Sequence, residues 1–254
     1  MNPVSLLAVG VAVLAGPASA PLPFAPGERL EMELRYATLL AGRARLRIDR
    51  GLEGDRPVLR FVLEAHSEGS FARLLNYRVR DRTRATWVPE SGCSLGIEKQ
   101  LREGRATRDQ VVRIDPEAGT ARVEDAKIEQ EHFEIGPCTL DVLSALFVTR
   151  LRGVPEEDSL RLPVFDNGER YVLEVRHLGR ETLDLPEPFG PGTPTVVVEP
   201  VLAEGTGLFV KEGRLKVWLT DDARRVPVRM ASKVPIGSVI AEVVAYSPGG
   251  EGAP

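Results

Sequence analysis

Alternation of apolar and polar residues dominates this chain. At 29–36, RLEMELRY places Leu30, Met32 and Leu34 on one side and charged residues on the other. A period of two is typical of a strand with one buried face. Similar runs occur at 43–48, 58–65, 80–88, 95–102, 107–114, 120–123, 132–135, 159–165, 170–178, 195–202, 213–219, 226–233 and 238–246. The pattern predicts a mostly β protein.

Turn residues connect these runs at short intervals. Asn167-Gly168 lies between two alternating segments, which is the strongest local signal for a β-hairpin. Short connections of this kind favour antiparallel pairing between consecutive strands. We therefore expect one antiparallel sheet.

One segment breaks the alternation and predicts a helix over 140–152. Thr139 is the expected N-cap, Asp141 suits the positive end of the helix dipole, and Gly153 is the expected C-cap. Apolar residues cover most of the circumference of this helix, so it should be buried on more than one side. A shorter helix is predicted near 70–76.

The expected fold is a single curved antiparallel sheet or open β-barrel with the apolar helix in its concave face. A curved sheet has one apolar face to cover, and one helix can cover it. We expect a single β-rich domain over 21–248 and a disordered tail at 249–254.

The first twenty residues differ from the rest. They carry no charge, are apolar from Val4 to Leu14, and end in the small-residue pattern Ala18-Ser19-Ala20. This is typical of a secretory signal peptide, and its apolar run is shorter than a membrane span requires. We expect a periplasmic protein, with an uncleaved membrane anchor as the alternative. No later segment is predicted to cross a membrane.

Charge and motifs exclude several classes of function. The net charge of −4 argues against nucleic acid as a partner. No nucleophile elbow, zinc-protease helix, phosphate loop or dinucleotide fingerprint occurs, and no cofactor or metal is predicted. His66, His132 and His177 are far apart in sequence, and Asp221-Asp222 is expected to serve a turn. We expect no enzymatic activity.

Cys93 and Cys138 are the two cysteines of the chain. In an oxidising compartment an even pair predicts a disulfide, and two buried thiols are the alternative. The bridge would tie the start of the apolar helix to a strand.

Two groups of residues are candidates for ligand binding. An apolar group could line a hydrophobic cavity or complete a dry core; it comprises Phe71, Leu74, Leu75, Leu143, Leu146 and Phe147. A basic group could meet anionic head groups or form a solvated outer face. Its alternating arginines are Arg78, Arg80, Arg82 and Arg84 on one predicted strand and Arg43, Arg45 and Arg47 on another. Lys99 and Arg102 belong to a charged cluster near a strand end.

Four stretches together resemble a known family. They are IEKQLREG (97–104), DVLSALFVTRLR (141–152), FDNGERYVLEVRHLGRETLDLP (165–186) and GRLKVWLTDDARRVPVRM (213–230). They are similar to domain-of-unknown-function family 3108, exported bacterial proteins mostly from Gram-negative species. The resemblance implies a periplasmic, β-rich protein and transfers no catalytic residues. The layout also looks like that of the LolA and LolB lipoprotein carriers, which bind acyl chains.

These observations lead to three hypotheses about function. The first is binding of a hydrophobic cell-envelope ligand such as a lipid or acyl chain. The second is a structural or interaction protein of envelope assembly, with a protein partner and no ligand. The third is a hydrolase of envelope glycans.

Overall fold

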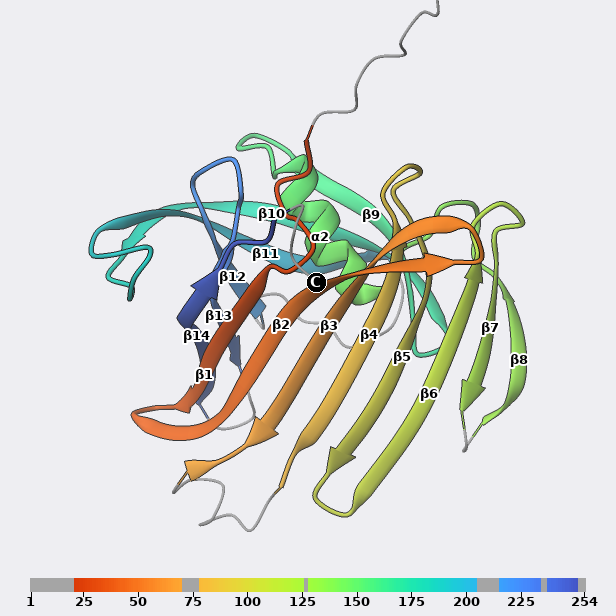
Figure 1. Ribbon diagram of the computed structural model, residues 1–254, viewed down its shortest axis with the longest axis horizontal. Helices are drawn as coiled ribbons and strands as arrows, with labels where there is room; N and C mark the ends of the chain where they lie inside the picture. The colour runs from red at the N-terminus through yellow and green to blue at the C-terminus, as the bar shows by residue number, and fades with distance from the viewer. Residues whose placement is uncertain (1–20, 70–77, 126–127, 205–214, 234–236, 251–254) are drawn as a thin grey trace, which may run out of the picture.

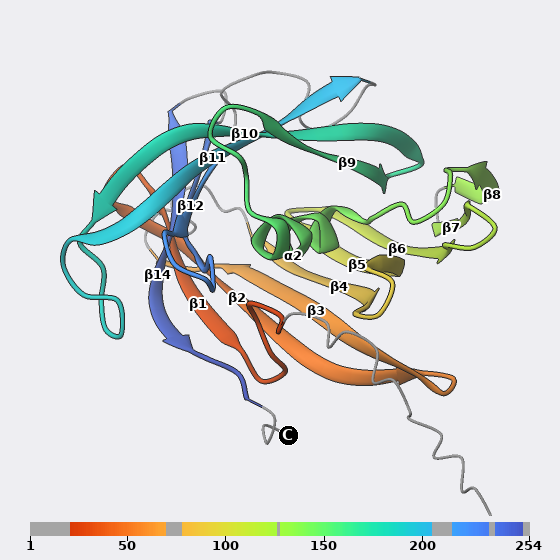
Figure 2. The same cartoon turned by 90° about the horizontal axis from the view of Figure 1, so that it is seen from above.

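One antiparallel sheet of fourteen strands curves around helix α2 (Val142–Arg152) in the computed structural model (Figures 1 and 2). The structure describes residues 21–69, 78–125, 128–204, 215–233 and 237–250. The strands are β1 (Arg29–Tyr36), β2 (Leu39–Glu53), β3 (Arg56–Ser67), β4 (Arg80–Val88), β5 (Cys93–Glu103), β6 (Ala106–Asp115), β7 (Thr120–Asp125), β8 (Ile128–Glu134), β9 (Ser159–Asp166), β10 (Glu169–Leu183), β11 (Thr193–Glu204), β12 (Leu215–Thr220), β13 (Pro227–Lys233) and β14 (Ser238–Ser247). The mostly β fold predicted from alternation is confirmed.

The strand order shows how the chain builds an open sheet. Strands β1 to β8 follow one another to one edge, α2 crosses to the opposite edge, and β9 to β14 return to the middle. There β14 pairs with β1, Arg29 opposite Ser247 and Tyr36 opposite Val239. Strands β8 and β9 are the two edges, so the sheet does not close.

The concave face of the sheet holds the core. Figure 2 shows α2 between the part of the sheet formed by β2 to β5 and the part formed by β9 to β11. The Phe147 ring of α2 stacks on the Phe61 ring of β3 with centroids 3.6 Å apart, and Phe24 packs edge-on to Phe147 at 5.1 Å. These side chains and Trp87 are buried. The apolar helix predicted to cover the curved sheet does so.

The helix begins two residues later than the sequence predicted. Asp141, not Thr139, is the N-cap, because its carboxylate accepts hydrogen bonds from the N–H groups of Leu143 and Ser144 at 2.9 and 2.8 Å. The Thr139 hydroxyl instead donates to the Ile135 carbonyl at 2.8 Å. Leu140 precedes the helix and pairs with β9. Gly153 is the C-cap, as predicted.

The two cysteines are joined. A disulfide links Cys93, at the start of β5, to Cys138, in the turn before α2, as the sequence predicted. Gly250 donates its N–H to the Pro26 carbonyl at 3.1 Å, so the first residues of the expected tail lie against the start of the domain.

Several expectations fall on undescribed residues. The leader 1–20 and the short helix near 70–76, with Phe71, Leu74 and Leu75, lie outside the described residues. Within the described part of the chain, no helix has the length and apolar character to cross a membrane.

Candidate functional site: a cleft at the C-terminus of helix α2

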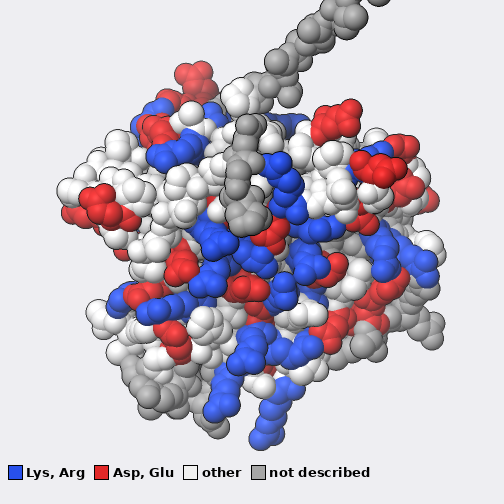
Figure 3. Space-filling view, in the orientation of Figure 1, with Lys and Arg blue, Asp and Glu red and all other residues white. Residues whose placement is uncertain are grey.

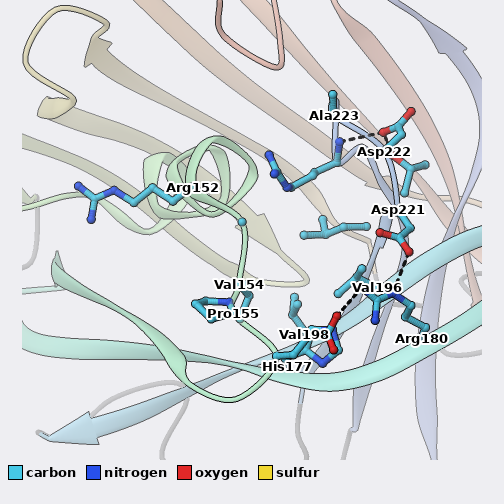
Figure 4. Close-up of a pocket in the computed structure, with 15 residues that line it drawn as sticks. Arg152, Val154, Pro155, His177, Arg180, Val196, Val198, Asp221, Asp222 and Ala223 are labelled. Atoms are coloured by element: carbon cyan, nitrogen blue, oxygen red, sulfur yellow. Dashed lines mark hydrogen bonds and ion pairs between the residues drawn. The ribbon is translucent and has the colours of Figure 1, made fainter. Parts of the chain in front are cut away.

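A cleft of about 450 Å³ lies where the chain leaves α2 and faces strands β10, β11 and β12 (Figure 4). Its volume is in the range of small-molecule sites. The lining residues are Arg152, Gly153, Val154, Pro155, Glu156, His177, Arg180, Val196, Val198, Leu219, Thr220, Asp221, Asp222, Ala223 and Arg225.

The floor of the cleft is apolar because alternate residues of the strands point inward. Val196 pairs with Leu219 across β11 and β12, and Val198 lies two residues along the same face. Val198 and Leu219 are buried and Val196 is half-buried. On the opposite side, Val154 and Pro155 follow the helix, as Figure 4 shows. Apolar surface therefore lines both walls.

The end of the helix fixes one wall. Gly153 has φ 70°, which favours glycine, and a Cβ there would lie 3.1 Å from Arg225 Nε. Arg225 Nη1 donates to the Arg150 carbonyl at 2.8 Å, which satisfies one of the free carbonyls in the last turn. The guanidinium of Arg225 thus connects the β12–β13 turn to the helix.

Three charged groups form the rim. Arg180 bridges two carboxylates, with Nη2 2.5 Å from Glu156 Oε1 and Nε 2.9 Å from Asp221 Oδ2. The hydrogen bond from Arg180 and its positive charge lower the pKa of Glu156, so this carboxylate stays ionised. Asp222 also lines the cleft and accepts the backbone N–H groups of Arg224 and Arg225 at 3.0 and 3.1 Å.

His177 contributes a polar atom that has no partner. Its Nε2 is buried and makes no hydrogen bond to the described residues. Its pairing with Val198 across β10 and β11 places it beside the apolar floor. A buried polar atom without a partner costs free energy, so a ligand that hydrogen-bonds to it would gain from the contact.

The apolar candidates of α2 do not line this cleft. Leu143 and Phe147 are buried in the core, and Leu146 packs against it. The structure therefore places these three side chains with the dry core, which was the alternative to a cavity lining.

The sequence predicted a surface cluster of Lys99 and Arg102, but Lys99 lies on the concave face of the sheet. Lys99 is only 7% exposed and its Nζ contacts Asp166 of β9 and, at 3.3 Å, Asn167 Oδ1. The expectation of surface ion pairing is wrong for Lys99, because alternation along β5 places it with the buried Ile97 on the concave face. Arg102 does point outward and pairs with Asp109 at 2.7 Å.

The arginines of β2 and β4 share the outer face but do not form one uninterrupted stripe. Strand β3 lies between them and contributes Glu64 opposite both Arg45 and Arg82. Figure 3 shows Lys and Arg side chains gathered over the middle and lower part of this face, with Asp and Glu interspersed. Arg84 pairs with Glu98 at 3.5 Å. The basic surface is therefore partly neutralised.

Sequence reasoning missed most of the cleft. His177 and Asp221 were noted separately, whereas Glu156, Arg180 and Val196 carried no signal. These residues come from the loop after α2, strands β10 and β11, and the turn after β12, so only the pairing of β10 with β11 and of β11 with β12 brings them together. Among the residues that the structure describes, no His, Cys, Asp and Glu cluster suited to a metal ion occurs.

Comparison with known proteins decides the family. The profile of the family described as "Protein of unknown function (DUF3108)" matches residues 31–244. The chain belongs to the DUF3108 family. The match spans the sheet from β1 to β14 together with α2, so the whole fold described above is that of the family domain.

A solved structure shows the same architecture. The DUF3108 chain is similar to a β-barrel-like protein of the domain of unknown function DUF1849 from Brucella abortus, with a TM-score of 0.59 and 11% identity over 87% of this chain and 97% of that one. At this identity the likeness shows the fold alone. No curated protein matches the sequence. The likeness in layout to LolA and LolB is not confirmed by these comparisons.

Proposed function

We propose that this DUF3108 protein is a periplasmic, non-enzymatic binding protein that holds the apolar part of a cell-envelope ligand in the cleft at the end of α2. The observation that carries the proposal is the cleft of about 450 Å³ with apolar walls and a charged rim. Pockets of this size and lining bind small amphipathic molecules. The leader-like sequence at 1–20 supports the periplasmic location.

The two parts of the cleft suit two parts of such a ligand. Apolar atoms of an acyl chain would remove Val196, Val198 and Leu219 from water, at about 25 cal/mol for each Å² buried. A hydroxyl, amide or ester group beside them could use the free Nε2 of His177. Arg180 is already held by Glu156 and Asp221, so it shapes the rim and is less suited to bind a second anion.

Support for binding rather than catalysis comes from the state of the carboxylates. A hydrolase of glycans needs one carboxyl whose pKa is raised, so that it can act as an acid. Arg180 lowers the pKa of Glu156. Burial alone would raise the pKa of Asp222, but hydrogen bonds from Thr220 and Arg224 hold this pKa below its ordinary value. Both groups are therefore poor general acids.

Filling the cleft tests the proposal. Ala223 lines the cleft and is exposed, so Ala223→Trp should place an indole in the opening without disturbing the core. We expect the wild type to bind the fluorescent apolar probe N-phenylnaphthylamine, and Ala223→Trp to weaken binding by about tenfold or more.

The small variant Ala223→Ser is the matched control and should bind as the wild type does. If Ala223→Trp binds the probe with unchanged affinity while it remains folded, the cleft is not the binding site. If the wild type does not bind apolar probes at all, the hypothesis of a structural protein without a ligand is favoured.

A further inference from the structure

A second, basic hollow of about 1370 Å³ lies at the far ends of β3, β4 and β5. It is separate from the cleft and shares no lining residue with it. Its lining residues are Glu64, Ala65, His66, Ser67, Glu68, Gly69, Arg78, Val79, Arg80, Asp81, Arg82, Gln100, Arg102 and Gly104. Four of these residues are arginines.

The backbone that carries two of these arginines is fixed by its neighbours. The Arg78 carbonyl accepts the Gly104 N–H at 2.7 Å. Val79 donates its N–H to Ser67 Oγ at 2.9 Å and accepts the Ser67 N–H at 3.0 Å. Contacts with β3 on one side and β5 on the other therefore hold Arg78 and Arg80 in place.

The acidic residues of the hollow are already engaged. The contacts are Glu64 with Arg82 Nε at 3.4 Å, Glu68 with Arg43 Nε at 2.8 Å, and Asp81 with the backbone N–H of Arg102 at 2.9 Å. Glu68 also contacts His66 Nε2 at 3.3 Å. Glu64 and Glu68 are thus paired with arginines, whereas the Asp81 carboxylate accepts a backbone N–H and keeps its negative charge.

Arg78 and Arg80 differ from most arginines of the outer face. Within the described part of the chain, neither has an ion-pair partner, whereas Arg43, Arg45, Arg47, Arg82, Arg84, Arg102 and Arg113 each have one. Both are exposed. Of the four arginines of the hollow, Arg78 and Arg80 are therefore the two without an ion-pair partner among the described residues, and Asp81 contributes one negative charge beside them.

We propose that this hollow is a binding site for a phosphate group, contacted by Arg78 and Arg80. Arg78 directly precedes β4, which begins at Arg80, and the bridge of Val79 to Glu103 continues the pairing with β5. In extended backbone of this kind, residues two apart have Cα atoms about 7 Å from each other and side chains on the same side. A guanidinium presents a planar fork that matches two phosphate oxygens, and two such forks at this spacing can hold one phosphate between them. The phosphate belongs to a lipid head group or to a soluble compound.

The test uses the whole mature protein and two double variants. Arg78→Ser with Arg80→Ser removes the proposed contacts. Arg113→Ser with Arg122→Ser is the control, because it removes the same charge from the same outer face, where both arginines lie near Glu124. All four side chains are exposed, so both variants should fold, which circular dichroism verifies.

Binding is measured with two probes. Co-sedimentation with vesicles of equal parts phosphatidylglycerol and phosphatidylcholine tests a lipid phosphate, and titration calorimetry with inorganic phosphate tests a soluble one. We expect the Arg78/Arg80 variant to lose at least about tenfold in affinity for one or both probes, since charge-assisted hydrogen bonds are lost. The Arg113/Arg122 variant should lose less than about threefold.

The pattern of losses identifies the source of the phosphate. Loss with vesicles alone indicates a lipid head group, and loss with inorganic phosphate indicates a soluble ligand. Equal weakening in both variants would show general attraction to a basic surface and overturn the site. Failure of the wild type to bind either probe would overturn it as well. Neither result bears on the cleft, which has its own test with an apolar probe.

Discussion

At the scale of single residues, Asp141 shows how a buried carboxylate organises the entry to α2. Besides the two backbone N–H groups, it accepts the hydroxyls of Ser94 and Ser144 at 2.7 and 2.6 Å. Ser94 lies on β5, so the cap also joins the helix to the sheet. Sequence rules found Asp141 but placed it inside the helix, because Thr139 is also a residue type that caps helices. The hydrogen bonds to Asp141 and the bridge of Leu140 to β9 show where the helix begins, and neither can be predicted from the sequence.

Replacing Asp141 should therefore destabilise the protein. Asp141→Ala removes the cap and leaves Ser94 and Ser144 without their acceptor, at a cost of about 2 kcal/mol in the free energy of unfolding. Asp141→Asn keeps an acceptor oxygen and should cost less. Urea denaturation measures both, and an alanine variant as stable as the wild type would contradict the assigned cap.

The direction in which Asp141 changes the stability of the protein with pH can be tested. Burial is the largest influence on its pKa, and the pKa is raised even though Ser144, Ser94 and Leu143 donate hydrogen bonds to the carboxylate. A carboxyl with a raised folded-state pKa contributes stability below its unfolded pKa, and that contribution is lost as pH rises through the folded pKa. The wild type should therefore lose stability relative to Asp141→Asn as the pH rises through this range, which denaturation at a series of pH values would show.

At the scale of elements, α2 is held by its side chains more than by its own helix propensity. Arg150 is fully buried and forms two hydrogen bonds with Glu28, at 2.7 and 3.2 Å. Its guanidinium also lies 5.2 Å from the centre of the Phe24 ring. Period and capping signals were sufficient to predict the strands and the helix. The partner of Arg150 could not be predicted, because Glu28 is 122 residues away in the sequence.

Phe147 is the side chain through which the helix meets the sheet. Phe147→Ala would remove the ring that stacks on Phe61 and leave a cavity, so we expect a loss of about 3–5 kcal/mol in unfolding free energy. Leu146→Ala, at a half-buried position on the same helix, is the control and should cost less. Equal losses in the two variants would contradict the packing described for α2.

At the scale of the whole molecule, a buried ionic cluster connects the two arms of the sheet. Lys99 of β5 contacts Asp166 and Asn167, while Arg108 of β6 donates to Asn167 Oδ1 at 3.2 Å and to Asp125 at 2.7 Å. The β9–β10 turn is thereby joined to β5 and β6 across the open side of the sheet. This contact depends on the curvature of the sheet. Alternation fixes which face Lys99 occupies but does not indicate which distant turn it meets.

Replacing one charged residue of this cluster should lower the free energy of unfolding more than replacing both residues of an ion pair. Lys99→Met leaves the Asp166 carboxylate buried without its cation, at a cost of about 3–5 kcal/mol. Lys99→Met combined with Asp166→Leu replaces the pair by apolar side chains and should recover much of that stability. Chemical denaturation of the two variants measures the difference. A single variant as stable as the double one would show that the pair does not connect the arms.

The central claim is that the cleft at the end of α2 holds an apolar ligand. The most direct measurement is native mass spectrometry of the full chain expressed in a Gram-negative host and purified gently from the periplasm, before and after organic extraction. The wild type should carry a bound molecule whose mass disappears on extraction, and Ala223→Trp should carry less of it. If the wild type and Ala223→Trp each appear only at the mass of the bare polypeptide, the claim is contradicted and a protein that acts through its surface alone is favoured.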